Sequence, residues 1–324
     1  MVGDVLSAVA FFEVSQRSTD RRSQQFRQLS ERNIFIGTSS WRYEGWLNQV
    51  YTPERYQTRG RFSKQKFHDE CIQEYAETFP VVGADFSFYA IPEPPFWKKV
   101  FDVAPSQLKW SLKVPEEFTA KRFSDQVRYG PRRGQENPAF LDAELFESAF
   151  LEPLAPYLDR IAVLIFEFGT FSQKAYAEPN AFFDDLNSFA RRLPKGIRYA
   201  VETRNDDYLQ ARYFDLLKAN GIAHAFNSWS RMPSLREQLL INEAFTTGHT
   251  VARALLRPGR LYQQAVDMFA PYKEVKEEYP SARQALHGLI DHSLRTETVA
   301  FLHINNRLEG NAVLTIAGVL GIAV

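Results

Sequence analysis

The hydrophobic residues of this chain gather in short runs that polar or turn-forming residues separate. Runs of this length, rich in β-branched and aromatic side chains, are typical of buried β-strands. We therefore expect eight strands, at residues 33–37, 82–87, 108–113, 161–167, 197–202, 222–226, 250–255 and 298–304.

Between these runs, apolar residues recur every three or four positions, which is the spacing of an amphipathic helix. In the last such segment, Ser281 and Gln284 resemble a capping box, a pair that closes the first turn of a helix. The apolar run that ends the chain predicts one more packed helix. The amphipathic segments are at 66–79, 139–158, 179–192, 208–219 and 281–294.

Short strands that alternate with helices indicate βαβ units and a parallel sheet. Eight such units favour a single (β/α)8 barrel of the TIM type over an open sheet. The first strand is followed by GTSSW and not by a glycine-rich phosphate loop, which counts against a dinucleotide-binding domain. We expect a barrel domain at 33–324, preceded at 1–32 by a polar extension that is helical or flexible.

Composition restricts the function further. Lys plus Arg and Asp plus Glu both number 39, so overall charge does not favour nucleic-acid binding, although a local basic patch would still permit it. The single cysteine, Cys71, cannot form an internal disulfide, and the N-terminus lacks the basic region of a signal peptide. The apolar C-terminal run is too short to span a bilayer. We expect a cytoplasmic protein without a membrane segment.

In a barrel of this type, ligands bind at the C-terminal ends of the strands. Glu202 and Arg204 share one face of the fifth strand, because side chains two apart point the same way. Buried charges are costly unless they are paired, so these two residues, Lys113 and Arg253 are expected to neutralise one another around a site. The other polar residues at or after strand ends include Ser39, Ser87, Glu167, Asn227, Arg257 and His303.

Several motifs in this order resemble the domain-of-unknown-function 72 (YecE-like) family from about residue 33 to residue 320. They are IGTSSWRYEGW, DFSFYAIP, SLKVPEEFT, VLIFEF, YAVETRNDDYL and INNRLEGNA. The family is similar to (β/α)8 barrels, and the resemblance implies no assigned reaction or substrate. It nominates Thr38, Trp41, Tyr43, Asp85, Tyr89, Lys113, Glu202, Arg204, Arg253, Asn305 and Asn306.

The chain also departs from the family pattern. Gly83 occupies a position where the resemblance implies a glutamate, and Glu167 replaces a glutamine. Asn205 and Ala120 stand where histidines are usual. These differences are typical of a divergent branch and weaken the case for a shared mechanism.

The first functional hypothesis is an enzyme or binder for an anionic or polyhydroxylated ligand, one that contains phosphate or sugar. Glu202, Lys113 and Asp85 would act in catalysis, with Glu202 as the general base. If it is an enzyme, a hydrolase, lyase or isomerase would fit. The arginines would hold anionic groups. The expected ligand-binding residues are Thr38, Ser39, Trp41, Tyr43, Tyr89, Arg204, Arg253, Asn305 and Asn306.

Two alternatives stay open. One is a metal-dependent enzyme that processes nucleic acids, in which Asp85, Glu167, Glu202 and His303 would surround a divalent ion. The spacing of these residues favours a metal-free polar pocket instead. The other is a binding or regulatory barrel that has lost catalysis, in which the charged side chains would scatter into separate salt bridges. The sequence does not indicate an oligomeric state.

Overall fold

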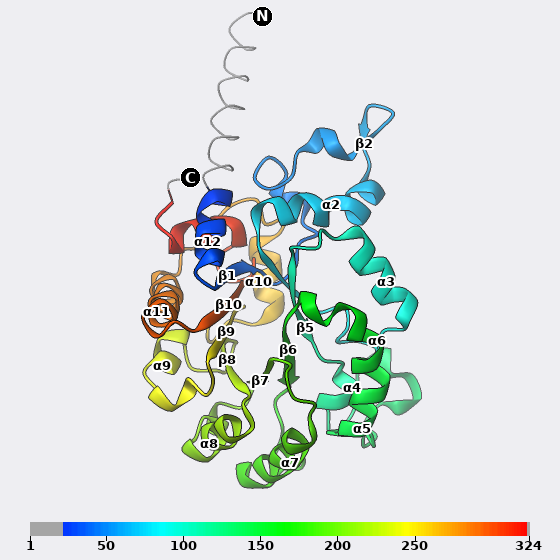
Figure 1. Cartoon of the computed structure of the whole chain (residues 1–324), viewed down its shortest axis with the longest axis vertical. Helices are drawn as coiled ribbons and strands as arrows, with labels where there is room; N and C mark the ends of the chain where they lie inside the picture. The colour runs from blue at the N-terminus through cyan, green and yellow to red at the C-terminus, as the bar shows by residue number, and fades with distance from the viewer. Residues whose placement is uncertain (1–21, 323–324) are drawn as a thin grey trace, which may run out of the picture.

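The computed structural model describes residues 22–322, and they form a closed barrel of eight parallel strands surrounded by helices (Figure 1). The strand order around the barrel is β1-β10-β9-β8-β7-β6-β5-β4, and β4 pairs again with β1. This confirms the expected barrel. The strands are β1 (Ile34–Thr38), β4 (Val81–Ala84), β5 (Lys109–Lys113), β6 (Ile161–Phe168), β7 (Tyr199–Thr203), β8 (Ala223–Ser228), β9 (His249–Ala254) and β10 (Val299–Ile304).

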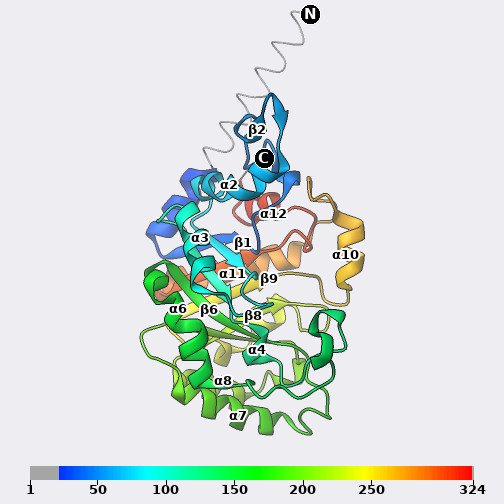
Figure 2. The ribbon, with the colours of Figure 1, turned by 90° about the vertical axis from the view of Figure 1, so that its right-hand side faces the viewer.

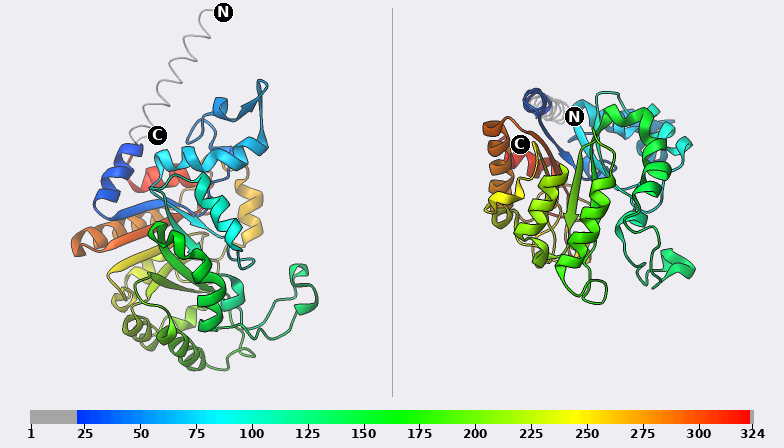
Figure 3. Two further views of the ribbon diagram at one scale, coloured as in Figure 1. Left: turned by 45° about the vertical axis from the view of Figure 1, so that its right-hand side comes forward. Right: turned by 60° about the horizontal axis from the view of Figure 1, so that its bottom comes forward.

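Helices cover the outside of the barrel, as the two turned views show (Figures 2 and 3). Besides the helix at residues 22–31, the α-helices longer than five residues are α2 (Lys64–Thr78), α3 (Pro94–Val103), α7 (Pro179–Arg192), α8 (Ala211–Asn220), α10 (Tyr262–Phe269), α11 (Pro280–Thr296) and α12 (Ala312–Val319). A small two-stranded sheet, β2 (Gln57–Thr58) and β3 (Arg61–Phe62), projects beside helix α2 (Figure 1).

Shorter helical segments lie in the connections. The longest expected helix, 139–158, corresponds to a continuous helical stretch at 143–160 whose turns change from α to π and then to 3-10 geometry, and the prolines at 153 and 156 lie in its last part. The short segments are η1 (Glu44–Trp46), η2 (Pro53–Tyr56), α4 (Glu116–Thr119), η3 (Val127–Arg132), α5 (Ala143–Leu145), η4 (Phe146–Leu151), α6 (Glu152–Leu154), η5 (Ala155–Arg160), η6 (Asp206–Tyr208), α9 (Leu235–Leu239) and η7 (Asn242–Ala244).

Helix starts differ from the sequence prediction in one instructive place. Helix α11 begins at Pro280, so Ser281 lies inside the first turn and the expected capping box is wrong. The backbone N–H of Tyr279 donates instead to the buried carboxylate of Glu309, which follows β10. A carboxylate that is distant in the sequence therefore accepts a hydrogen bond at the start of this helix, where the local pattern predicted a pairing between Ser281 and Gln284.

The barrel interior has an apolar layer below a polar one. Val251 and Phe301 belong to a buried cluster inside the sheet, and the partly buried Phe35 packs against it. Two residues further along β9 and β10, Arg253 and His303 lie side by side. Because side chains two apart share a face, the apolar layer sits directly under the polar layer at the C-terminal ends of the strands.

The residues before the barrel are helical where the structure describes them. Residues 22–31 form a helix whose Phe26 is buried and stacks on Phe79 at 5.1 Å between ring centroids. Residues 1–21 of the expected extension lie outside the described residues, so the domain boundary near residue 32 stays a prediction.

Gly310 is required by the turn that leads from β10 into α12. Its φ is +117°, and a Cβ there would lie 2.6 Å from the carbonyl oxygen of Glu274. We expect Gly310→Ala to lower the free energy of unfolding by roughly 2–4 kcal/mol, because strain and a backbone clash add.

Urea denaturation measures this effect, and Gly196→Ala is the matched control. Gly196 also has a positive φ, of +85°, but a Cβ there would meet open space. The control therefore carries backbone strain alone. Equal losses in the two variants would show that the contact with residue 274 does not matter.

Candidate functional site

Three cationic side chains converge on the carboxylate of Glu167 at the end of β6. Its Oε2 lies 2.8 Å from Lys113 Nζ, 3.0 Å from Arg204 Nη2 and 2.7 Å from Arg253 Nη1. These cations come from β5, from the residue after β7 and from β9, so the closed sheet brings together residues that are distant in the sequence.

Glu202 completes this group, which we call the ion cluster: Lys113, Glu167, Glu202, Arg204 and Arg253. Glu202 is fully buried and contacts both arginines. Its Oε1 lies 2.6 Å from Arg204 Nη2 without hydrogen-bond geometry, whereas Oε2 accepts a hydrogen bond from Arg253. With all five groups ionised, the ion cluster carries one more positive than negative charge.

Burial and pairing act in opposite directions on these groups. Burial alone would raise the pKa of Glu167, but the three surrounding cations outweigh it and hold this pKa well below its usual range. Burial lowers the pKa of Lys113, and Glu167 opposes that shift only in part. Lys113 is thus easier to deprotonate than an exposed lysine.

Arg204 has an unused donor in this cluster. Its guanidinium lies 4.1 Å from the ring centroid of Trp229 and is almost completely buried. Among residues 22–322, its Nη1 has no hydrogen-bond partner. A buried donor without a partner costs free energy, so this atom is suited to meet a ligand or an ordered water.

A polar pair lies next to the ion cluster inside the barrel. His303 Nε2 lies 2.8 Å from Ser111 Oγ, and the imidazole is fully buried. Burial, with a smaller contribution from Arg253, lowers the pKa of His303 to about 3. A Cβ at Gly83 would lie 3.3 Å from this ring, so the glycine lets the imidazole fill the space. The sequence places His303 at a strand end, but no local pattern indicates Ser111 as its partner.

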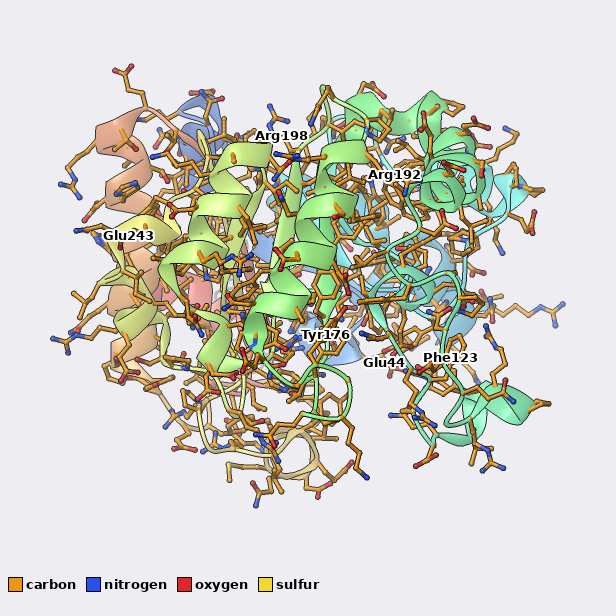
Figure 4. All side chains as sticks on the ribbon, turned by 90° about the horizontal axis from the view of Figure 1, so that it is seen from below. Glu44, Phe123, Tyr176, Arg192, Arg198 and Glu243 are labelled. Carbon is orange, nitrogen blue, oxygen red and sulfur yellow. The ribbon has the colours of Figure 1, made fainter. Side chains whose placement is uncertain are left out.

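A cleft of about 720 Å³ opens beside the ion cluster, and Glu167 lines it. Its walls come from the loop after β5, the loop after β6 and Phe88 beyond β4. Phe123 and Tyr176, labelled in Figure 4, belong to the same two loops. Both basic and acidic side chains line the cleft: Lys121, Arg122 and Lys174, and Glu116, Glu136 and Glu167.

The residues expected from the first strand are mostly engaged in packing. Thr38 Oγ1 contacts the hydroxyl of Tyr75 at 2.8 Å and donates to the carbonyl of residue 40. Trp41 is buried edge-on against Trp110. Ser39 is buried, and its hydroxyl has no partner among residues 22–322.

Three other expected residues lie nearer the surface. Asp85 is exposed just beyond β4. Tyr89 is 58% exposed, and the guanidinium of Arg128 lies 5.0 Å from its ring centroid. Tyr43 is half-buried, with its ring 5.4 Å from that of Tyr272. The described residues show no direct contact from these three to the ion cluster.

The amide oxygens of the two asparagines after β10 accept hydrogen bonds from N–H groups of the protein. Asn306 Oδ1 accepts from Trp46 Nε1 at 3.2 Å and from the N–H of residue 312 at 2.8 Å. Asn305 Oδ1 accepts from the N–H of residue 307. Arg257, another expected anion contact, pairs with Glu277 at 2.6 Å instead of joining the ion cluster.

The expected grouping is therefore found in part. Lys113, Glu202, Arg204 and Arg253 share one cluster, whereas Asp85, Tyr89 and the asparagines lie outside it. The described part of the chain contains no group of three or more His, Cys, Asp or Glu side chains placed to hold a metal ion. Within residues 22–322, no helix is both long and apolar enough to cross a membrane.

Comparison with known proteins gives consistent results. A family model described as "Protein of unknown function DUF72" matches residues 35–321. The UPF0759 protein YunF of Bacillus subtilis (strain 168) is 32% identical over 137 residues, which are 42% of this chain and 39% of that protein. The match thus spans about two-fifths of the length of the curated relative.

Solved structures show the same fold. A DUF72 family protein from Enterococcus faecalis V583 has a TM-score of 0.58 at 17% identity, over 90% of this chain and 96% of that chain. Another from Thermotoga maritima MSB8 has a TM-score of 0.57 at 16% identity, over 89% and 98%. At such low identity, these structures support the barrel and not an activity.

The ion cluster makes a testable contribution to stability. We expect Glu202→Gln to lower the free energy of unfolding by about 3–5 kcal/mol, because two buried arginines lose a charged partner. Glu77→Gln is the control, since Glu77 pairs with Arg55 at the surface, where a pair is worth about 0–1 kcal/mol. Denaturant titration measures both variants, and a loss in Glu202→Gln no larger than in the control would contradict the expectation.

The neutral imidazole of His303 predicts a pH dependence. The unfolded chain binds a proton on this residue near pH 6.5, whereas the folded protein does so only near its pKa of about 3. The unfolded state therefore binds more protons in this window, and stability falls as the pH drops from about 6.5 towards 3.

We expect His303→Gln to flatten this pH dependence. Urea denaturation at several pH values between 7 and 4 measures the slope. His68→Gln serves as the control, because His68 is exposed on α2. The expectation is wrong if the His303→Gln protein loses stability as steeply as the parent over this range.

Proposed function

The chain belongs to the DUF72 family of proteins of unknown function, and we propose that the mouth of its barrel binds a small anionic ligand through the ion cluster. One observation carries this proposal: three cations and only two carboxylates are buried together next to an open cleft. An anion would balance the remaining positive charge, and a phosphate or carboxylate suits the guanidinium of Arg204.

Lys113 and Arg204 are the proposed contact residues. Lys113 lies at the end of β5 and pairs with Glu167, which lines the cleft. Arg204 offers a buried donor that has no partner among residues 22–322. Arg253 is engaged by both glutamates, so we propose that it fixes the geometry of the cluster.

If the site is catalytic, we propose that Lys113 exchanges a proton with the ligand. Burial makes its ammonium more acidic than usual, so Lys113 would give a proton to the ligand or take one from it, while Glu167 at 2.8 Å stays ionised and orients the ammonium. Glu202 lies deeper and holds both arginines, so we propose a positioning role for it. Asp85, exposed beyond β4, stays a proposed participant only for a ligand that extends out of the barrel.

A metal-dependent reaction on nucleic acid has less support. Glu167 and Glu202, which would have been metal ligands, are both engaged by cationic side chains. We also propose a cytoplasmic location, because a single cysteine, Cys71, is buried and its thiol pKa is raised to about 12.

Inorganic phosphate is the simplest probe for the proposed site. We expect isothermal titration calorimetry to detect phosphate binding by the parent protein, and Lys113→Met to weaken that binding at least tenfold by removing a contact charge. Lys98→Met is the matched control, because Lys98 lies on the surface and pairs only with Asp102 among residues 22–322. No binding by the parent, or equal binding by both variants, would exclude this function.

A further inference from the structure

We propose that the ligand of this cleft is a sugar phosphate, and that the hydroxyl of Thr119 forms a hydrogen bond with one of the sugar hydroxyl groups. This inference rests on the proposed anion site and names the rest of the ligand. The additional evidence comes from the walls of the cleft.

Thr119 ends helix α4 and lines the cleft. Its side chain is 1% exposed, yet its Oγ1 has no hydrogen-bond partner among residues 22–322. Buried hydroxyls are nearly always paired, because an unmade hydrogen bond leaves the cost of removing the group from water uncompensated. Because Thr119 lines the cleft, we infer that its missing partner comes from there, as either a ligand group or a water molecule.

The size and lining of the cleft favour a hydroxylated ligand. A volume of about 720 Å³ is far larger than an inorganic anion needs and falls within the range of small-molecule sites. Three further hydroxyl side chains, Ser124, Thr170 and Ser172, line it with Thr119. Hydroxyl groups both donate and accept, so they suit a ring that carries several hydroxyls of its own.

The cleft also provides an apolar face for a sugar ring. Phe88 lines the same cleft, and Lys113 Nζ lies 4.4 Å from its ring centroid. A phosphate near Lys113 would thus bring an attached ring towards Phe88, while Thr119 lies on another wall. The anionic group and the hydroxyl contacts are then met by different residues, so their contributions can be separated by mutation.

The experiment compares two probes on the same full-length protein. Inorganic phosphate reports on the ion cluster, and glucose 6-phosphate and fructose 6-phosphate report on the cleft walls. We expect at least one hexose phosphate to bind the parent tenfold or more tightly than inorganic phosphate does. Equal affinities for all three probes would overturn the sugar assignment while leaving the anion site intact.

Thr119→Val removes the hydroxyl and keeps the shape of the side chain. We expect it to weaken the preferred hexose phosphate about tenfold and to leave inorganic phosphate binding unchanged. Thr119→Ser, which retains a hydroxyl, should recover most of the lost affinity. Ser188→Ala is the matched control for loss of a hydroxyl, because Ser188 is exposed on α7 and does not line the cleft.

Each result bears on a different part of the proposal. If Thr119→Val binds the hexose phosphate as tightly as the parent, the residue contacts only water and the proposal is wrong. If the variant loses both probes equally, its effect is structural and the proposal is also wrong. If the parent binds none of the probes, the anion site fails and this inference fails with it.

Discussion

The structure depends on the pairing of charges inside a closed sheet. Moving one ionised side chain out of water into a barrel would cost several kcal/mol, so these groups are tolerated only because each meets an opposite charge. Glu167 is central, since it contacts all three cations of the ion cluster. The register of the strands sets these distances, and the apolar layer beneath supports the strands that carry them.

The need to pair buried charges also distinguishes the two layers of the barrel interior, one apolar and one polar. The apolar layer around Phe301 excludes water and stabilises the fold. The polar layer above it opposes folding unless all its groups are satisfied. His303 satisfies this requirement only in part: its ring fits against Gly83, its Nε2 contacts Ser111 and burial keeps it neutral, but its Nδ1 has no hydrogen-bond partner among residues 22–322.

The sequence predicted the barrel well because parallel strands buried on both faces are nearly continuous apolar runs. All eight expected strands are present, with ends that differ by at most three residues. The alternation of side chains along a strand was also sufficient to group Glu202 with Arg204. Helices α3 and α10 were not predicted: both are short, and α10 includes the exposed residues Tyr262 and Met268.

The candidate site was less predictable, because its details depend on contacts across the barrel and on loop conformation. Glu167 appeared as one strand-end residue among many, although the closed sheet makes it the centre of the ion cluster. Asn306 resembled a pocket residue, but its amide oxygen supports the chain after β10. Thr119 lies beyond a strand end, in a segment whose position only the folded loops determine.

With all five groups ionised, the ion cluster carries one surplus positive charge. An unbalanced charge in a buried cluster raises the free energy of the folded protein, and an anion that binds there removes part of that cost. A site of this kind therefore gains affinity from the strain of its unliganded state, as well as from direct contacts. The cleft adds the second requirement, because its hydroxyl-lined walls extend well beyond the volume of a simple anion. In the proposed site, charge balance would determine where an anion is held, and the loops after β5 and β6 would determine which ligand fits.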